Sequence, residues 1–291
     1  IGYKGTAYLD GSYRKDWSSA LPSNSNGYGY YSIGGSLIFS ELVDLGPLSF
    51  GKVRAGVAQV GSDVDALATS PLYPIAQKPF NTTVVMYTPG TLVDPNLKPA
   101  INTSFETGID LKFLEDRIGL NLTYFTETRK DEIVTIGIPK ASGYSNYTTN
   151  IGEGKRSGFE IALSADVVRM RNGFSWNTLF NIAKYENEVV ELAPGIDAIP
   201  GPGGSDDWSF ATVYQRVKGQ WGELRGRGIA KDDNGNYILE ANGLYKTQTD
   251  IYFGSVLPKF SGGFVNTFSF KGISLQVAMD FQKDGKFFSL S

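Results

Sequence analysis

Apolar and polar residues alternate over long stretches of the chain, which indicates extended strands with one apolar and one polar face. In residues 158–167 the apolar face carries Phe159, Ile161, Leu163, Ala165 and Val167, and the opposite face carries Glu160, Ser164 and Asp166. The same alternation occurs in residues 104–113, 118–127, 174–183 and 272–281. Helical periodicity is nearly absent, so the pattern predicts an all-β fold.

The lengths of the alternating segments and of their connections indicate strands that cross a membrane. The segments run for roughly 9 to 14 residues, whereas soluble strands usually have ~5–6 and tilted membrane-spanning strands need ~9–11. Short and long connections alternate along the chain. The short ones are residues 42–47, 114–117, 171–173 and 271–272, and the long ones are residues 15–29, 61–98, 131–154 and 187–257.

This asymmetry predicts part of a transmembrane antiparallel β-barrel, with about nine strands, short periplasmic turns and long extracellular loops. The apolar faces of the strands would then contact lipid, and the polar faces would line the lumen. The residues expected to face the lumen are Glu106, Asp110, Asn121, Glu160, Ser164 and Asp166. A soluble β-sandwich would show the same alternation, with its apolar faces turned inward, so that alternative stays open.

Composition removes several classes of function. The chain has no cysteine and no histidine, which excludes thiol catalysis, serine–histidine triads and zinc or iron sites with these ligands. The net charge of −3 favours no nucleic-acid partner. No apolar run approaches the ~18 residues of a membrane-spanning helix. These absences remove much of the usual enzyme repertoire, and we expect no cofactor.

Three short motifs invite chemical interpretations that their spacing does not favour. Glu106 and Asp110 share a strand face, but at ~3.3 Å per residue they would lie ~13 Å apart, too far for a glycosidase pair. Residues 231–236 read KDDNGN, and their glycine comes one position too early for a calcium loop, so we expect a hairpin turn there. Residues 152–158, GEGKRSG, lack the spacing of a phosphate loop.

Aromatic residues in the long loops are the best candidates for contacting a ligand, because aromatic faces stack on sugars and pack against peptide side chains. These candidates are Tyr144, Tyr147, Trp208, Tyr214 and Trp221. The alternative is that they pack against one another or against a partner protein. Four basic residues lie close to the tryptophans: Arg216, Lys218, Arg225 and Arg227. They could meet an acidic ligand or lipopolysaccharide phosphates, or form a solvated loop face.

Several segments resemble, in sequence and in order, the barrel of SusC/RagA-type TonB-dependent transporters. The resemblance is carried by NLKPAINTSFETGIDLKFLEDRIGLNLTYFTETRKDEI (96–133), ASGYSNYTTNIGEGKRSGFEIALSA (141–165) and LPKFSGGFVNTFSFKGISLQVAMDFQKDGKFFS (257–289). DWSSALP (16–22) and FSELVDLGPLSFGKVRAGVAQVG (39–61) are similar too. The loops at 61–98 and 190–257 resemble the family least.

The resemblance implies that residues 1–291 are the C-terminal portion of a plugged barrel of the 22-strand class, without the plug domain or the N-terminal barrel strands. It also implies TonB-dependent import of a large nutrient, an oligosaccharide or oligopeptide, across the outer membrane of a Gram-negative bacterium. The implied partners are a SusD/RagB-like surface lipoprotein, the TonB complex (through the missing N-terminal part), outer-membrane lipid and the glycan or peptide ligand. A passive porin, a soluble carbohydrate-binding sandwich and a β-rich hydrolase are the alternatives.

Overall fold

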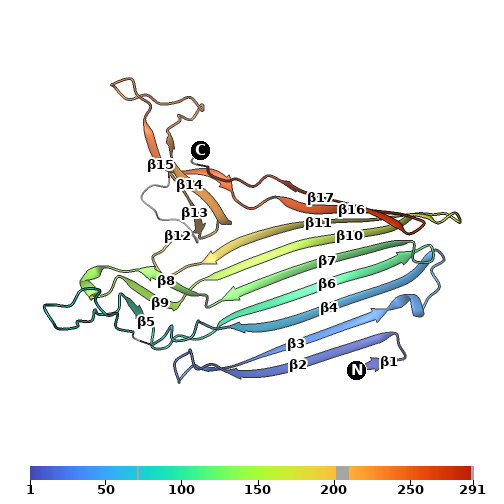
Figure 1. Cartoon of the computed structure of the whole chain (residues 1–291), viewed down its shortest axis with the longest axis horizontal. Helices are drawn as coiled ribbons and strands as arrows, with labels where there is room; N and C mark the ends of the chain where they lie inside the picture. Colours follow the sequence, from blue (N-terminus) through green and yellow to red (C-terminus); the bar gives the residue numbers. More distant parts are fainter. Residues whose placement is uncertain (71, 201–209, 290–291) are drawn as a thin grey trace.

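One broad, curved antiparallel sheet dominates the structure, and two small sheets lie beyond one end of its strands (Figure 1). The computed structural model describes residues 1–70, 72–200 and 210–289. The main sheet has ten strands in the order β1-β2-β3-β4-β6-β7-β10-β11-β16-β17. Strands that follow one another in the sheet therefore also follow one another along the chain, except where the small sheets are inserted.

Nine of these strands are long, in agreement with the predicted number. The bounds of the ten strands are β1 Gly2–Tyr3, β2 Ala7–Trp17, β3 Gly27–Ile38, β4 Leu48–Ser62, β6 Ala100–Phe113, β7 Ile118–Lys130, β10 Glu153–Arg169, β11 Phe174–Glu191, β16 Phe260–Phe270 and β17 Ile273–Lys283. Apart from the two-residue β1, they run from 11 to 18 residues. The all-β, antiparallel architecture predicted from the alternation is confirmed.

The strand register places the apolar residues of successive strands in continuous rows on one face of the sheet. One row crosses nine strands and consists of Ala7, Leu37, Val53, Ile109, Leu122, Ile161, Ile182, Gly262 and Phe281. Residues directly opposite one another in an antiparallel pair point to the same face, so the alternation within each strand becomes one apolar face of the whole sheet.

No other element covers this apolar face among the described residues. Ile161 is 38% exposed, Leu122 is 36% exposed and Met279 is 53% exposed, although each lies in the middle of its strand. In water, a sandwich would bury such a face against a second sheet. A sheet that leaves it open suits a hydrocarbon surrounding, as in the wall of a membrane barrel.

The described structure contains no helix with the length and hydrophobicity needed to span a membrane.

The short and long connections lie at opposite ends of the sheet (Figure 1). At the short-turn end the connections are residues 39–47, which contain the 3-10 helix η1 (Phe39–Glu41), and residues 114–117, 170–173 and 271–272. At the long-loop end they are residues 18–26, 63–99, 131–152 and 192–259. The predicted asymmetry is confirmed for three of the four long connections. The expected loop at 15–29 shrinks to residues 18–26, which is no longer than residues 39–47 at the short-turn end, because β2 and β3 extend into it.

The long loops contain ordered structure that the polar sequence did not reveal. Three of their strands, β5 (Thr91–Val93), β8 (Ile133–Gly137) and β9 (Asn146–Asn150), form a small sheet, and η2 (Lys140–Ser142) follows β8. Four more strands form a second small sheet: β12 (Ala198–Pro200), β13 (Ala211–Arg216), β14 (Trp221–Ile229) and β15 (Thr247–Ser255). The long connections predicted at 131–154 and 187–257 are present, and they contain these shorter strands.

The main sheet is not closed into a cylinder by the described residues, because β1 and β17 stand at its two edges. Open strand edges carry unpaired backbone N–H and C=O groups, which hydrocarbon does not tolerate. The described strands therefore form a sector of a barrel wall that needs further strands to close.

Candidate functional site

The polar face of the main sheet carries a hydrogen-bonded cluster centred on Arg54 of β4. Its guanidinium pairs with the carboxylate of Glu106, and its Nε lies 3.9 Å from the carboxylate of Asp110. Its Nη2 also donates a hydrogen bond of 2.6 Å to the hydroxyl of Thr123. Gly108 makes room for this side chain, since a Cβ at that position would lie 2.9 Å from the Nη2 of Arg54.

Three of the six residues predicted to line the lumen meet in this cluster. Asn121 donates a hydrogen bond to Asp110, and the hydroxyl of Thr123 donates one of 3.2 Å to the side-chain oxygen of Asn121. Arg54 thus joins Glu106 and Asp110, and its charge compensates two carboxylates that lie on one strand. These ion pairs link β4 to β6 and reduce the negative charge of the polar face.

The other three predicted residues share this face but lie apart along β10. Glu160 accepts a hydrogen bond of 2.9 Å from the hydroxyl of Tyr185. Ser164 lies over Gly119, where a Cβ would come within 2.6 Å of its hydroxyl oxygen. Asp166 accepts a hydrogen bond from Asn177 and pairs with Arg169 near the short-turn end. Register thus places all six residues on the polar face, and their exposure to a lumen stays a prediction.

Replacing Arg54 with glutamine should lower the free energy of unfolding by about 1 to 2 kcal/mol, because Glu106 and Asp110 lose their shared counter-charge. The side chains of Arg54 and Glu106 are 30% and 50% exposed, so water takes up part of the loss. Lys112→Gln, which breaks the exposed pair with Asp116, is the control and should change stability by less than about 1 kcal/mol. Denaturant unfolding in lipid vesicles measures both. Equal effects would contradict the special role of Arg54.

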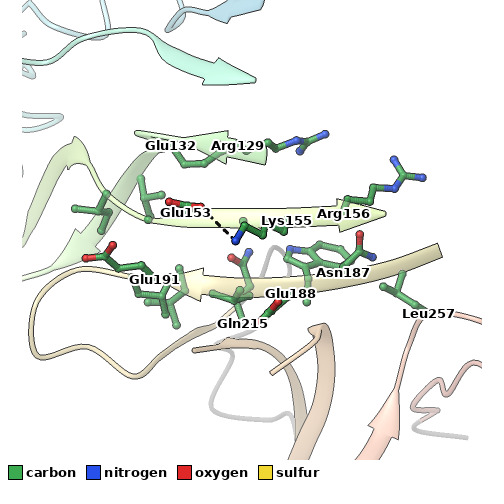
Figure 2. Close-up of a pocket in the computed structure, with 18 of the residues that line it drawn as sticks. Arg129, Glu132, Glu153, Lys155, Arg156, Asn187, Glu188, Glu191, Gln215 and Leu257 are labelled. Atoms are coloured by element: carbon green, nitrogen blue, oxygen red, sulfur yellow. Dashed lines mark ion pairs between the residues drawn. The ribbon is translucent and has the colours of Figure 1, made fainter. Parts of the chain in front are cut away.

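A cavity of about 660 Å³ lies at the long-loop end, between the main sheet and the second small sheet (Figure 2). The ends of β7, β10 and β11 form one wall, and residues of β12, β13 and β14 form the other. Two backbone hydrogen bonds fix the walls together: Lys218 N–H donates to the Val189 carbonyl at 2.8 Å, and Val189 N–H donates to the Gly219 carbonyl at 3.0 Å. The cavity is therefore a product of how the two sheets join.

Charged side chains of both signs line this cavity. Glu153 has partners, since its carboxylate lies 3.2 Å from the ammonium of Lys130 and 3.9 Å from that of Lys155. The side chains of Arg129, Arg156, Glu132, Glu188 and Glu191 form no ion pair among the described residues. Part of the cavity's charge is thus uncompensated by the protein.

Arg156 is held in place by two aromatic rings. Its guanidinium carbon lies 4.5 Å from the ring centroid of Tyr185 and 5.5 Å from that of Phe125, distances typical of cation–π contacts. The two rings meet across Gly158, with centroids 5.7 Å apart. Because these contacts already fix the guanidinium, pairing it with an anionic group would cost the protein little conformational entropy.

The aromatic residues predicted to contact a ligand separate into different places. Trp221, in β14, lines the cavity, whereas Tyr214, in β13, is not among the lining residues. Tyr147 belongs to β9 in the other small sheet, and Tyr144 precedes that strand. Trp208 lies outside the described residues. Ligand contact by any of them stays a prediction, and the structure brings only Trp221 to the cavity.

Two of the four basic residues near the tryptophans are engaged in ion pairs. The Nε of Arg225 lies 2.7 Å from the carboxylate of Glu223. The carboxylate of Asp250 lies 3.0 Å from Nη2 of Arg216 and 3.4 Å from Nη1 of Arg225. This network ties β13, β14 and β15 together. The positive charge expected from the sequence is therefore partly compensated by Glu223 in β14 itself and by Asp250 in the neighbouring β15.

Sequence reasoning missed the arginines Arg54, Arg129 and Arg156, and the glutamates Glu188 and Glu191. The sequence did contain a signal for the arginines. Each of them falls on the polar face of its strand in the alternating pattern, as Glu106 and Glu160 do. Nothing local in the sequence shows that residues 129, 156 and 188 share a cavity, since that depends on the pairing of three strands.

Asp94 holds the first small sheet to the loop before β6. The pKa of Asp94 is lowered by the backbone N–H of Asn96, at 2.8 Å, and by the hydroxyl of Thr149, at 2.7 Å. Burial is the main cause that raises the pKa of Tyr147, and the nearby carboxylate of Asp94 raises it too.

Because the folded-state pKa of Asp94 is depressed, its stabilising effect is present above its unfolded value near ~3.9 and is lost as pH falls through the folded pKa. Asp94→Asn should make the backbone amides of residues 146–150 exchange hydrogen several-fold faster at pH 7, because the charged acceptor is removed. Hydrogen exchange with mass spectrometry measures this. Asp65→Asn in an exposed loop is the control, and unchanged protection in Asp94→Asn would refute the role.

The KDDNGN segment forms the turn that the sequence predicted. Lys231 and Tyr237 make an antiparallel bridge, and the N–H of Asn236 donates to the side chain of Asp232 at 2.8 Å. This and the other backbone donors of the turn lower the pKa of Asp232. Residues 152–158 run into strand β10, so they do not form the loop-to-helix geometry of a phosphate site.

The sheet defines a class of protein: its open apolar face and its alternation of short turns and long loops are those of an outer-membrane β-barrel. Residues 4–276 match the family described as "TonB dependent receptor-like, beta-barrel". The chain therefore belongs to this family, whose members are outer-membrane proteins of Gram-negative bacteria.

Relatives and solved structures agree with this assignment. TonB-dependent receptor P26 of Formosa agariphila is 27% identical over 290 residues, covering 89% of this chain and 28% of that protein. TonB-dependent receptor SusC of Bacteroides thetaiotaomicron is 29% identical over 164 residues, covering 54% of this chain and 16% of that protein. A structure of the RagAB peptide transporter superposes with a TM-score of 0.77 at 20% identity, over 96% of this chain and 32% of its own.

The chain spans between 16% and 28% of the length of the curated relatives it matches. The similarity to the RagAB structure supports the fold, and the family assignment rests on the family match.

Proposed function

We propose that residues 1–291 form the C-terminal portion of the barrel of a TonB-dependent importer, which brings an oligosaccharide or oligopeptide across the outer membrane. The observation that carries this proposal is the family match over residues 4–276. The open apolar face supports it, because the face suits lipid. The plug domain and the remaining barrel strands would belong to parts of the protein outside this chain.

In this proposal the chain supplies barrel wall, lumen surface and extracellular structure. The polar face with the Arg54 cluster lines the lumen, and the two small sheets stand above the membrane, where a SusD/RagB-like lipoprotein would cap the barrel. The TonB complex would act through the N-terminal part of the protein. Import of this kind makes and breaks no covalent bond in the cargo, so we propose no enzyme activity.

Deleting the gene in its native organism should abolish growth on the cargo, supplied as the only source of carbon or nitrogen. Deleting TonB should have the same effect, since import depends on energy from the inner membrane. The test grows each strain on defined peptide and oligosaccharide pools and restores the gene on a plasmid. Growth that needs the gene but not TonB would point to a passive porin and overturn the proposal.

A second measurement uses the full-length protein extracted with detergent from outer membranes. We expect an intact mass several times 31.7 kDa and a lipoprotein in comparable amount. A water-soluble species near 31.7 kDa would instead favour a soluble binding module.

A further inference from the structure

The apolar face of the main sheet ends at a boundary of lysines on the side of the long loops. Along the nine long strands, this face carries no charged side chain from the short-turn end outward until a lysine appears in five of them. The polar face, in contrast, carries charges of both signs, such as Arg54 and Glu106. The five lysines, called the outer lysine row below, are Lys15 of β2, Lys130 of β7, Lys155 of β10, Lys184 of β11 and Lys283 of β17.

The outer lysine row follows the level at which a membrane would end. On the neighbouring strands β11, β10 and β7, Lys184 comes two positions beyond the apolar row described above, Lys155 six positions beyond it and Lys130 eight positions beyond it. Barrel strands are tilted in the membrane, so a plane parallel to the membrane crosses successive strands at such increasing offsets. The lysines therefore lie along one level, at the outer edge of the lipid-facing band.

Three of these strands carry an arginine next to the lysine, on the opposite face of the sheet. The adjacent residues are Arg14–Lys15, Arg129–Lys130 and Lys155–Arg156. Lysine thus occupies the lipid side and arginine the polar side. A lysine suits the lipid side because its flexible stem lies along apolar surface while its compact ammonium reaches the headgroup level.

Two members of the outer lysine row have no carboxylate partner among the described residues. Lys15 lies over the ring of Trp17, at 5.1 Å from its centroid, and Lys283 lies over the ring of Phe260, at 5.9 Å. Aromatic side chains at this level are typical of the interface between lipid and water. Both ammonium groups are therefore free to pair with an anion at the membrane surface.

Carboxylates accompany the other three lysines but lie farther from the membrane. Glu153 is 3.2 Å from the ammonium of Lys130 and 3.9 Å from that of Lys155, so one carboxylate serves two lysines. Glu186 lies 2.7 Å from Lys184. The carboxylates on this face that come after the lysine of their own strand are Glu153, Glu186, Glu188 and Glu191. A group that approaches from the lipid side therefore meets the ammonium groups first.

We infer that the outer lysine row binds phosphate groups of lipopolysaccharide in the outer leaflet. Lysine binds phosphate as a point charge, and basic residues beside a membrane attract anionic headgroups. A neutral headgroup would leave Lys15 and Lys283 without a counter-charge at this level. The site lies on the outer surface of the barrel wall, so it is independent of the cargo and of the proposed import function.

The test titrates lipid A into the full-length transporter, purified in a neutral detergent and exchanged until it carries no lipid A of its own. The probes are lipid A with both phosphates, the same lipid with both phosphates removed, and inorganic phosphate. Microscale thermophoresis should show that the dephosphorylated lipid binds about tenfold or more weakly. Inorganic phosphate should not displace the phosphorylated lipid, because it lacks the acyl chains that hold the lipid against the apolar face.

Lys15→Gln/Lys155→Gln should weaken binding of the phosphorylated lipid by about tenfold or more, since each basic residue beside an anionic lipid surface contributes about fivefold. This variant leaves Glu153 paired with Lys130. The matched control is Arg14→Gln/Arg156→Gln, which removes the same charge one residue along the same strands but on the polar face. The control and the charge-conserving Lys15→Arg/Lys155→Arg should both stay within about twofold of the wild type, because the outward charge is kept.

Four results would overturn the inference: equal affinity for the two forms of lipid A, displacement of the lipid by inorganic phosphate, an equal loss in the Arg14→Gln/Arg156→Gln control, or a loss in the arginine-for-lysine variant. Displacement by inorganic phosphate would assign the lysines to a soluble anion instead of a lipid. Growth on the cargo and its dependence on TonB are measured separately, so each of these results leaves the import function standing.

Discussion

Ile161→Arg should lower the free energy of unfolding in lipid by about 2 to 4 kcal/mol, the destabilisation expected near the middle of a lipid-facing strand. Ile161 lies in the apolar row between Leu122 of β7 and Ile182 of β11, and it is 38% exposed. In lipid this exposed surface contacts hydrocarbon, where a guanidinium loses its hydration. The measurement is the folded fraction of the full-length protein in vesicles across a denaturant series.

Ala162→Arg is the matched control, because it places the same charge one residue along the same strand but on the opposite face. Ala162 lies in a polar row between Asn121 and Asn181. A guanidinium there remains in a polar surrounding, so we expect a loss below about 1 kcal/mol. If Ala162→Arg proved the more damaging change, the apolar face would not be the lipid face, and the barrel interpretation would fail.

The second large effect is expected at Gly158, where the sheet leaves no space for a side chain. A Cβ at this position would lie 2.6 Å from the carbonyl oxygen of Lys184 and 2.8 Å from the ring of Tyr185. It would also lie 3.0 Å from the ring of Phe125. Gly158→Ala should therefore lower stability by about 1 to 3 kcal/mol, as overpacking does.

The rings over Gly158 also hold Arg156, so the same change should displace its guanidinium. Gly34→Ala is the control, since Gly34 is in the main sheet on the same polar face and a Cβ there would come no closer than 3.9 Å to another atom. Denaturant unfolding is measured on both variants. Equal stability of the two would contradict the close packing at Gly158.

Much of the fold could be predicted because its signal is local. The alternation of apolar and polar residues in 158–167 predicts a strand and assigns its two faces, since successive side chains of any strand point in opposite directions. The turn at KDDNGN was predictable for the same reason, because Asp232 and Gly235 act within a few residues of each other. Even the division of connections into short and long ones required only the spacing between alternating segments.

The two small sheets escaped prediction because several of their strands are short and some of the paired strands lie far apart in the chain. β5 pairs in parallel with β9, whose residues follow more than fifty positions later, and neither strand shows sustained alternation. For the basic residues near Trp221, the sequence left an acidic ligand and a solvated loop face open. Asp250, on the neighbouring strand β15, supplies a counter-charge that sequence order does not reveal, whereas Glu223 lies only two residues from Arg225.

The sequence by itself determined the strand class of this protein, the apolar and polar face of each long strand, and the family to which it belongs. Only the tertiary structure decided that Arg54 joins Glu106 and Asp110, and that Arg129, Arg156 and Glu191 line one cavity with Trp221. The physical reason is that a strand's faces follow from its own backbone geometry, with a period of two residues. Contacts across strands depend instead on register and on how the long loops fold back, and a register shift of one residue would change every such contact.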